Sequence, residues 1–392
     1  MTGLASAPEL RALVRELRDR EFPWTAATTY LNNASVGPTP ERTRRALEAF
    51  NAKRTAPHLL PDRELFPILA GARESAARLI GAAADEIALV PSTSAGLTAA
   101  ARALPLAPGD GVVVSDREFP ANVYPWQALR RLGVTVELAP VTAEGFPDEG
   151  YLLERIADRS VRALAISYVQ FSNGFKADLA RLGAACRDHG VYFVVDAIQG
   201  LGASALDVSR TPVDLLACGG QKWLLSPWGS GFLYVRRELI GKLEPAAAGW
   251  LSYDGTEDFT NLLKYSDRLR PDARRFEVLP AFQDNLGFVT SLGLLLELGV
   301  AAIDVYTRAL GEPLLAWAER RGVRVVSPTD PLHRSAIVCV APSHPAEAHR
   351  RLKRAGIICS LREGAIRVAP HCYNTLEEME KVVGVLEEAL LE

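Results

Sequence analysis

The sequence has little of what marks membrane, secreted or disulfide-linked proteins. Only 5 of its 392 residues are cysteine. The number is odd and no C-x-x-C pair occurs, so reduced thiols are expected rather than a disulfide framework. Apolar runs such as 191–195 are far shorter than the roughly 20 residues of a membrane span, and the N-terminus has no signal-peptide pattern. We therefore expect a cytoplasmic protein with no membrane partner.

Charge of one sign, repeats and nucleotide motifs are also missing. Lys and Arg total 44 and Asp and Glu total 47, a net charge of −3, which argues against a nucleic-acid partner. The absence of a fixed repeat excludes solenoids and propellers. No G-x-G-x-x-G lies between a first strand and helix, which disfavours a nucleotide-dependent oxidoreductase on a doubly wound sheet. No metal site is predicted.

What is present is an alternation of short apolar strands and helical segments. Strands are predicted at 86–91, 111–115, 134–138, 163–169, 191–195, 215–218 and 231–235. Several of them are apolar throughout, as expected for a sheet that is covered by helices on both faces. The predicted fold class is therefore α/β, with a large domain built on a mostly parallel sheet.

The C-terminal part has a different character. Residues 286–321 are rich in Leu and Ala and predict one or two long helices. They are followed by strands at 323–326, 336–340 and 365–368 and by helices at 346–355 and 376–391. The length also favours two domains. We expect a large domain at 21–285 and a small α+β domain at 286–392, with residues 1–20 a candidate addition to the small domain.

Two polar residues follow predicted strands. Asp196 comes directly after 191–195, and Lys222 follows a short apolar strand and two glycines and precedes Trp223. Open α/β sheets bind ligands at the carboxyl ends of their strands. A lysine among apolar residues usually has an amine that is neutral, paired or covalently used. The alternatives are a helix N-cap for Asp196 and a structural role for Lys222.

A third segment offers hydroxyl groups. Thr93 and Ser94 lie between the predicted strand at 86–91 and a helical run. Hydroxyls and free backbone amides at a helix N-terminus can hold an anion. The same Ser-Thr-Ser pattern also serves as a simple helix cap.

With these residues in place, the chain resembles the class V aminotransferase family of fold-type I pyridoxal phosphate enzymes. This family includes cysteine desulfurases, selenocysteine lyases, kynureninases and isopenicillin-epimerase-like proteins. The similarity runs in order from residues 30–35 to residues 370–375. The resemblance implies pyridoxal 5'-phosphate as cofactor, an amino acid as substrate, and a homodimer whose active sites form at the subunit interface.

The resemblance also implies cofactor-binding roles for the candidates. Lys222 would form the Schiff base with the cofactor and then move the substrate's α-proton as general base and acid. Asp196 would pair with the protonated pyridine nitrogen, and Gln199 would contact the phenolic oxygen. Thr93 and Ser94 would hold the phosphate. Without the resemblance, Gln199 would be interpreted as a surface helix residue.

Other residues correspond to the ring-stacking and substrate positions. Phe119 would lie on the cofactor ring where desulfurases have His, since Phe can stack but cannot donate a proton. Arg367 would bind the substrate α-carboxylate with its two-pronged guanidinium, and Arg362 would help to shape that pocket. Asn33 and Gln170 are further candidates for substrate contact. The alternatives are a core position for Phe119 and a solvated strand edge for Arg367.

The chain departs from the family pattern in three places. The loop that carries the nucleophilic Cys of desulfurases is cut short, so we interpret Cys359 and Cys372 as buried structural thiols. Gly219 and Gln221 stand where many relatives have Ser and His. In relatives, a Gly-Thr pair in the corresponding segment binds the cofactor phosphate of the neighbouring subunit. Segment 275–280 lacks this pair, so other groups must complete the phosphate-binding site.

The leading hypothesis is a pyridoxal phosphate enzyme that labilises a bond at Cα of a small amino acid, by transamination or by β-elimination of the C–S lyase type. One alternative is a cysteine desulfurase or selenocysteine lyase that uses Cys359 or Cys372. An alternative of another class is a non-catalytic cofactor-binding scaffold or regulator. The presence of both Lys222 and Asp196 argues against the last of these, because such a protein would be free to lose them.

Overall fold

A seven-stranded sheet forms the centre of the protein, which we describe from a computed structural model covering residues 8–278 and 280–391. Its strands, in spatial order, are β2 (Ile87–Leu89), β8 (Gly231–Val235), β7 (Leu215–Gly219), β6 (Tyr192–Asp196), β5 (Val161–Ser167), β3 (Gly111–Ser115) and β4 (Thr135–Ala139). Strands β3 to β7 pair in parallel, whereas β8 runs antiparallel to β7 and β2. The predicted α/β fold class is confirmed.

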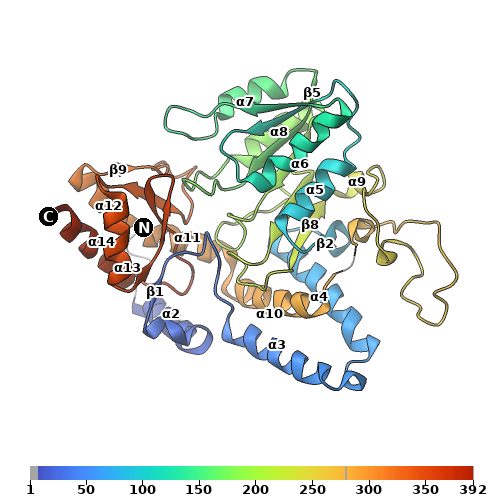
Figure 1. Ribbon diagram of the computed structural model, residues 1–392, viewed down its shortest axis with the longest axis horizontal. Coiled ribbons are helices and arrows are strands. Elements are labelled where there is room, and N and C mark those ends of the chain that lie inside the picture. Colours follow the sequence, from blue (N-terminus) through green and yellow to red (C-terminus); the bar gives the residue numbers. More distant parts are fainter. Residues whose placement is uncertain (1–7, 279, 392) are drawn as a thin grey trace.

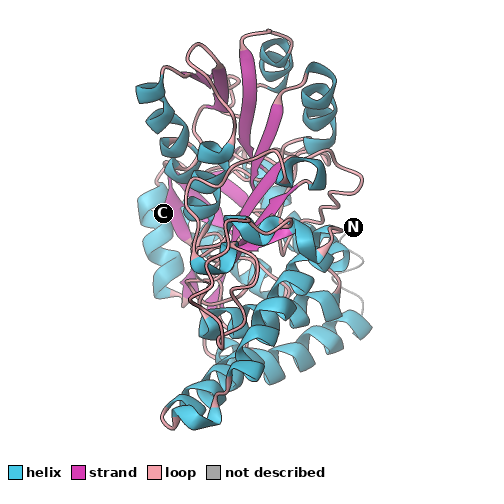
Figure 2. Cartoon of the chain, turned by 90° about the vertical axis from the view of Figure 1, so that its right-hand side faces the viewer, coloured by secondary structure: helices cyan, strands magenta, loops and turns pink. Residues whose placement is uncertain are grey.

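Helices lie on both faces of this sheet, as Figures 1 and 2 show. The flanking helices are α4 (Asp62–Ile80), α5 (Thr93–Ala103), α7 (Glu149–Ile156), α8 (Leu179–His189) and α10 (Phe282–Leu298). Along β6, Phe193 and Val195 belong to the core cluster that contains Leu182 of α8, whereas Val194 belongs to the cluster that contains Leu97 of α5. Successive strand residues point to opposite faces, so both faces of β6 are apolar because both are covered.

A smaller antiparallel sheet follows in the C-terminal part. Its order is β12 (Ser360–Arg362), β13 (Ala365–Val368), β10 (Val338–Ala341) and β9 (Arg324–Val325), and the helices around it are α11 (Val300–Leu310), α12 (Glu312–Arg321), α13 (Pro345–Arg354) and α14 (Leu376–Leu391). Val14 of α2 (Pro8–Glu21) lies in the same core cluster as Trp317 and Leu386. Residues 1–7 of the segment considered for this domain lie outside the described residues.

The N-terminal segment connects the two parts. β1 (Thr29–Tyr30) pairs in parallel with β11 (Ile357–Ile358), and Asn32 forms a bridge with Ala369. A few residues later, the amide of Gly37 donates a hydrogen bond to the carbonyl of Gln221 at 2.9 Å. This segment therefore runs from the small sheet to the loop that carries Lys222.

The region 286–321 contains three helices where one or two were predicted. Gly299, with φ 79°, separates α10 from α11, and Gly311 separates α11 from α12. Within the described residues no single helix is long and apolar enough to cross a membrane; α10 and the helices after it meet that criterion only together, with a bend of 76° between them. The remaining helices are α3 (Glu41–Arg54), α6 (Tyr124–Gln127) and α9 (Arg237–Ile240).

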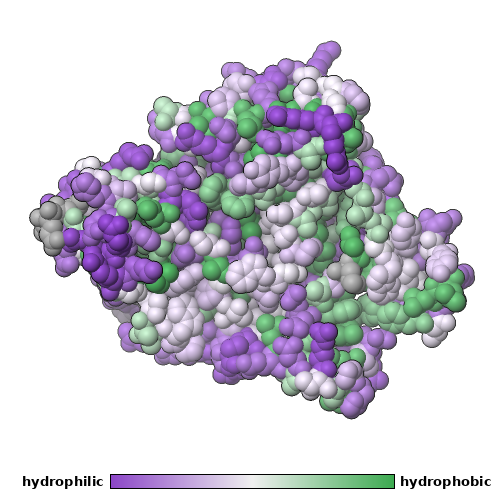
Figure 3. Space-filling model, in the orientation of Figure 1, coloured by the Kyte–Doolittle hydropathy of each residue, from purple (hydrophilic) through white to green (hydrophobic). Residues whose placement is uncertain are grey.

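A long excursion without helix or strand extends from one side of the molecule, between Tyr253 and Leu269, which form an isolated bridge at its base (Figure 1). It carries large exposed apolar side chains, among them Leu263 (85% exposed) and Tyr265 (86% exposed). The space-filling view shows apolar surface on this side of the molecule (Figure 3). We call residues 253–269 the apolar arm.

Candidate active site

Lys222 and Asp196 meet at one edge of the central sheet. Asp196 ends β6, and Lys222 follows β7, its parallel neighbour, in which Ala217 pairs with Asp196. Burial lowers the pKa of the Lys222 amine to about 8, although the charge of Asp196 opposes this shift. The neutral form of the Lys222 amine is therefore a minority near physiological pH, but it is far more populated than in a lysine with the ordinary pKa of about 10.4.

Asp196 is a buried carboxylate with one clear backbone partner. Its side chain is 2% exposed, and its Oδ1 accepts a hydrogen bond from the amide of Ile198 at 3.0 Å. Burial raises the pKa of Asp196 to about 6, against the effects of that hydrogen bond and of the Lys222 charge. A buried carboxylate of this kind is stabilised by any cationic or N–H group that is placed opposite it.

Phe119 lies beside the lysine. The Lys222 Nζ atom is 5.5 Å from the centroid of the Phe119 ring. The ring is 44% exposed, and the edge of Phe171 packs against it at 5.3 Å between centroids. Phe119 thus presents an open aromatic face at the site rather than filling the core.

Thr93 and Ser94 are the first residues of helix α5. Ser92 is the N-cap, since its Oγ accepts from the amide of Ala95 at 3.2 Å. Thr93 is buried and its Oγ1 accepts from the amide of Gly219 at 2.8 Å, whereas Ser94 is exposed. The helix N-terminus and the strand end that leads to Lys222 are therefore in direct contact.

A side chain at position 219 would crowd Gln221 and Thr93. A Cβ atom at Gly219 would lie 2.6 Å from the Gln221 Oε1 atom and 3.2 Å from the Thr93 Oγ1 atom. The amide group of Gln221 thus fills the space into which a serine at 219 would project. The two departures from the family pattern, Gly219 and Gln221, compensate one another sterically.

Gln199 supports the residue that follows the lysine. Its Oε1 accepts from the indole Nε1 of Trp223 at 2.9 Å, and its Nε2 donates to the carbonyl of Ala34 at 2.9 Å. His371 accepts from the amide of Cys372 through Nδ1 at 2.7 Å, so its Nε2 carries the proton that it donates to the Trp223 carbonyl at 2.9 Å. Burial lowers the pKa of His371 to about 4.

Arg367 reaches the site from β13 of the small sheet. Its Nη1 donates to the carbonyl of Phe171 at 2.6 Å and its Nη2 donates to Ser35 Oγ at 2.9 Å. Burial lowers its pKa to about 10. Its Nε is buried and has no hydrogen-bond partner in the described part of the chain, and the same is true of Arg362 Nε.

Asn33 and Gln170 are both buried, but they differ in how many of their side-chain amide atoms lack a hydrogen-bond partner. Asn33 donates to the Ala369 carbonyl at 3.0 Å and accepts from the Tyr373 hydroxyl at 3.1 Å, so both ends of its amide are engaged. Gln170 donates to Glu118 at 2.6 Å, and its Oε1 has no partner among the described residues. Gln170 therefore keeps an acceptor for a ligand, whereas Asn33 joins the N-terminal segment to the small sheet.

Glu118 is a buried residue of the site that was not predicted from the sequence. It accepts hydrogen bonds from the amide and hydroxyl of Ser167 and from the side-chain amides of Gln170 and Asn122. Burial raises its pKa to about 7, and the charge of Asp196 contributes to this shift. Its position just after the strand at 111–115 is the same signal that drew attention to Asp196.

The two thiols considered as nucleophiles are buried. Burial raises the pKa of Cys359 to about 12 and that of Cys372 to about 12. Cys359 lies between β11 and β12, and its carbonyl contacts His349 Nε2 at 3.1 Å. This burial agrees with the interpretation as structural thiols. No group of His, Cys, Asp and Glu in the described residues could hold a metal ion.

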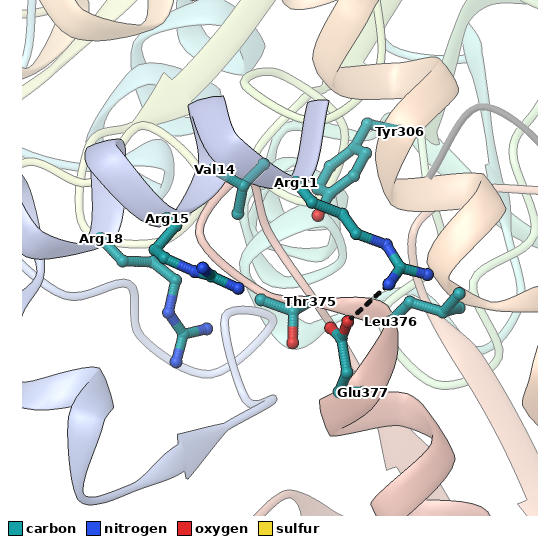
Figure 4. A pocket seen from close by; sticks show the side chains of 8 residues that line it. All are labelled: Arg11, Val14, Arg15, Arg18, Tyr306, Thr375, Leu376 and Glu377. Carbon is teal, nitrogen blue, oxygen red and sulfur yellow. Dashed lines mark ion pairs between the residues drawn. The ribbon is translucent and has the colours of Figure 1, made fainter. Parts of the chain in front are cut away.

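A separate cavity of about 220 Å³ lies between α2, α11 and the start of α14 (Figure 4). An ion pair crosses its mouth, from Arg11 Nη1 to Glu377 Oε1 at 3.3 Å. None of the predicted site residues lines this cavity. Its lining consists of Arg11, Val14, Arg15, Arg18, Tyr306, Thr375, Leu376 and Glu377.

Comparisons with known proteins agree with this architecture. The family model described as aminotransferase class-V matches residues 29–384. An uncharacterised aminotransferase of Bacillus subtilis, YcbU, is 32% identical over 80% of this chain and 81% of its own length. A probable cysteine desulfurase of Methanothermobacter thermautotrophicus is 28% identical over 94% of this chain and 96% of its own length.

A solved structure shows the same fold. The apo structure of a cysteine desulfurase from Thermococcus onnurineus superimposes with a TM-score of 0.84 at 23% identity, covering 96% of this chain and 97% of that one. The family match extends over the central sheet, the lysine loop and the small sheet alike. The chain therefore belongs to the aminotransferase class-V family of pyridoxal-phosphate-dependent enzymes.

Proposed function

We propose that Lys222 is the cofactor-binding and proton-transferring lysine of an enzyme that acts on amino acids. The observation that carries this proposal is the pairing of a buried, low-pKa amine at Lys222 with a buried carboxylate at Asp196 on neighbouring strand ends. An amine must be neutral to bind a carbonyl carbon covalently. Burial of Lys222 provides that neutral form.

The surrounding residues fit pyridoxal phosphate in chemistry and in position. Asp196 would hold a proton at the pyridine nitrogen, and the open face of Phe119 would lie along the ring. The N-terminus of α5, with Thr93 and Ser94, would hold the phosphate through hydroxyls and backbone amides. When bound, the cofactor supplies an electron sink for a carbanion at the substrate Cα.

The remaining groups would position the substrate. Arg367 would bind the α-carboxylate by exchanging its present contacts with Ser35 and Phe171 for the ligand. The free Oε1 of Gln170 would accept a hydrogen bond from the substrate or the cofactor. The freed Lys222 amine would then take the proton from Cα and return it, because its pKa of about 8 suits both steps.

For the reaction class we propose transamination or β-elimination of the C–S lyase type. A cysteine desulfurase or selenocysteine lyase mechanism would need a thiolate. The raised pKa values of Cys359 and Cys372 and their burial argue against one. A non-catalytic cofactor-binding scaffold would need no substrate pocket, whereas Gln170 Oε1 and Arg367 Nε are buried without hydrogen-bond partners among the described residues.

We also propose that the enzyme is a homodimer and works in the cytoplasm. A largely apolar cavity of about 600 Å³ opens beside α5 and has Ser94, Phe276 and Val278 in its wall. The apolar arm carries the exposed side chains of Leu263 and Tyr265, and Figure 3 shows apolar surface on the side of the molecule from which the arm extends. A second copy seated on this surface would bury apolar side chains and would reach Ser94 at the phosphate site.

The experiment that tests the proposal compares Lys222→Ala with Lys242→Ala, a control at an exposed lysine. Each protein is incubated with pyridoxal phosphate, reduced with borohydride, digested and examined by mass spectrometry. The expected result is one cofactor adduct on the peptide that contains Lys222, present in the native protein and in the control and absent from Lys222→Ala. An adduct elsewhere, or none in the native protein, would overturn it.

A further inference from the structure

Arg362 and Arg367 lie on one face of the same β-hairpin. In the register of β12 and β13, Ser360 pairs with Arg367 and Arg362 pairs with Ala365. Residues two apart along a strand share a face, so Arg362 and Arg367 are diagonal neighbours, with backbones about 7–8 Å apart. Ile366 points the other way, into the core of the small domain. The two arginines therefore face away from that core.

Both guanidinium groups act on Lys222. After burial and the opposing charge of Asp196, the positive charges of Arg367 and Arg362 contribute to the lowered pKa of the lysine. The charge of Arg362 also lowers the pKa of Arg367. The two guanidinium groups of the hairpin are thus close enough to Lys222 for their charges to act on it.

No carboxylate among residues 8–278 and 280–391 forms an ion pair with either of the two arginines. Other partly buried arginines have one, such as Arg73 with Glu277 and Arg236 with Asp214, each at 2.7 Å. In the described part of the chain Arg362 and Arg367 form no ion pair, and the Nε atom of each is buried without a hydrogen-bond partner. Burying a charge without a counterion is unfavourable, so the arrangement is suited to bind anionic groups.

The two arginines are not needed for the anionic phosphate of the cofactor, because other residues are assigned to it. The cofactor phosphate is assigned to the N-terminus of α5, where Thr93 contacts the amide of Gly219 on the large sheet. Asp196 provides the negative charge opposite the pyridine nitrogen. One arginine suffices for the single α-carboxylate of an amino acid, which leaves the second guanidinium for another group of the substrate.

We propose that Arg362 selects amino acids that carry a second anionic group at the end of the side chain. Arg367 binds the α-carboxylate and Arg362 binds the distal carboxylate, or a sulfinate or sulfonate in its place. This inference rests on the proposed function, since it assumes that the amino group reaches the cofactor on Lys222. A two-pronged guanidinium is well suited to such a group.

The test compares binding of acids with that of their neutral amides, which differ little in shape. L-Glutamate and L-aspartate are titrated into the holoenzyme against L-glutamine and L-asparagine, with cofactor absorbance as the readout. Glutarate and its monoamide, which have no amino group and cannot react, are compared by calorimetry. We expect each acid to bind about 10- to 100-fold more tightly than its amide, as for loss of a charge-assisted contact.

The variants Arg362→Met and Arg362→Lys are then measured beside Arg354→Met. Arg354 is an exposed residue of α13 that pairs with Glu347, so Arg354→Met should keep the native preference. Arg362→Met should reduce the preference to less than about threefold, and Arg362→Lys should retain part of it because the charge remains. Thermal unfolding of each variant checks that the fold is intact.

Two negative results have different meanings. Equal binding of acid and amide by a native holoenzyme whose cofactor is attached to Lys222 overturns the role of Arg362 and leaves the proposed function in place. A preference that persists in a folded Arg362→Met protein does the same. Absence of the cofactor adduct on Lys222 overturns the proposed function itself.

Discussion

The carbonyl oxygen of Lys222 occupies the place of a side chain at Gly37: a Cβ atom at that glycine would lie 1.9 Å from the oxygen. The backbone of the N-terminal segment is thus pressed against the lysine loop, and the hydrogen bond from the Gly37 amide to Gln221 fixes the contact. Because Gly37 has no Cβ atom, its backbone can approach the Lys222 carbonyl this closely. This close packing helps to fix the position of Lys222.

Gly37→Ala should therefore displace the lysine loop. We expect a loss of about 1–3 kcal/mol in the free energy of unfolding, typical of overpacking, together with weaker cofactor binding. Gly384→Ala is the matched control, because its Cβ would meet nothing within 4 Å. Chemical denaturation and cofactor titration measure both effects. An unchanged Gly37→Ala protein would mean that the segment can move away at little cost.

Attachment of the cofactor to the apoprotein should depend on pH through the Lys222 amine. The pKa of about 8 means that the neutral form is scarce below pH 8 and dominant above it. The attachment rate should rise about tenfold per pH unit up to that point and then level off. Stopped-flow absorbance gives the profile. A midpoint near the ordinary lysine value of about 10.4 would contradict the burial argument.

Asp196→Asn should move this profile in a defined direction. The Asp196 charge raises the pKa of Lys222, so removing the charge should shift the midpoint to lower pH. The same variant should lose catalytic rate, on the order of 100-fold or more, because the ring nitrogen loses its charged partner. A midpoint that moves upward would show that the two side chains do not interact as described.

The buried thiols should be unreactive. Cys359 and Cys372, whose pKa values are raised to about 12, should resist alkylation by iodoacetamide in the native protein at pH 8 and react after unfolding. Cys359→Ser and Cys372→Ser should keep turnover within about threefold of the parent, since both thiols are buried and are interpreted as structural. Loss of sulfide release from L-cysteine in either serine variant would favour the desulfurase alternative.

The ion pair between Arg73 and Glu277 should be a strong local contributor to stability. Glu277 is fully buried, binds Arg73 at 2.7 Å and also accepts from the amide of Leu89 in β2 at 2.8 Å. Arg73→Met should cost about 3–5 kcal/mol by leaving that carboxylate unpaired. Arg237→Met, which breaks an exposed pair with Asp85, should cost less than about 1 kcal/mol. Denaturant titrations give the free energy of unfolding of each variant. Equal losses in the two variants would contradict the prediction.

The sequence alone predicts most of the large sheet because its strands are apolar on both faces. The predicted strands at 111–115 and 231–235 coincide with β3 and β8, and 191–195 lies one residue from β6. The sequence gives no bounds for the very short strands β1, β11 and β12, although it indicates a strand around Cys359. They have only two or three residues each, and their pairing depends on segments that are far apart in the chain.

The candidate site was predictable in part for the same reason. Asp196 and Lys222 follow recognisable strands, so their meeting at one sheet edge follows from parallel pairing. The hydrogen-bond partners of Gln199 could not be predicted from the strand pattern, because Ala34 and Trp223 come from two separate loops. Glu118 was missed because a glutamate between Arg117 and Phe119 resembles a surface residue until Ser167 and Gln170 are seen to surround it.

The contact between Arg367 and Ser35 joins residues that are 332 positions apart. During synthesis the large sheet can form while the later part of the chain is still being made, since domains fold as units from the N-terminus. The contact between Arg367 and Ser35 cannot form until the hairpin of β12 and β13 has emerged. A ribosomal product that stops before that hairpin would retain Lys222 and Asp196 but would lack Arg367, the group proposed to hold an amino acid by its carboxylate.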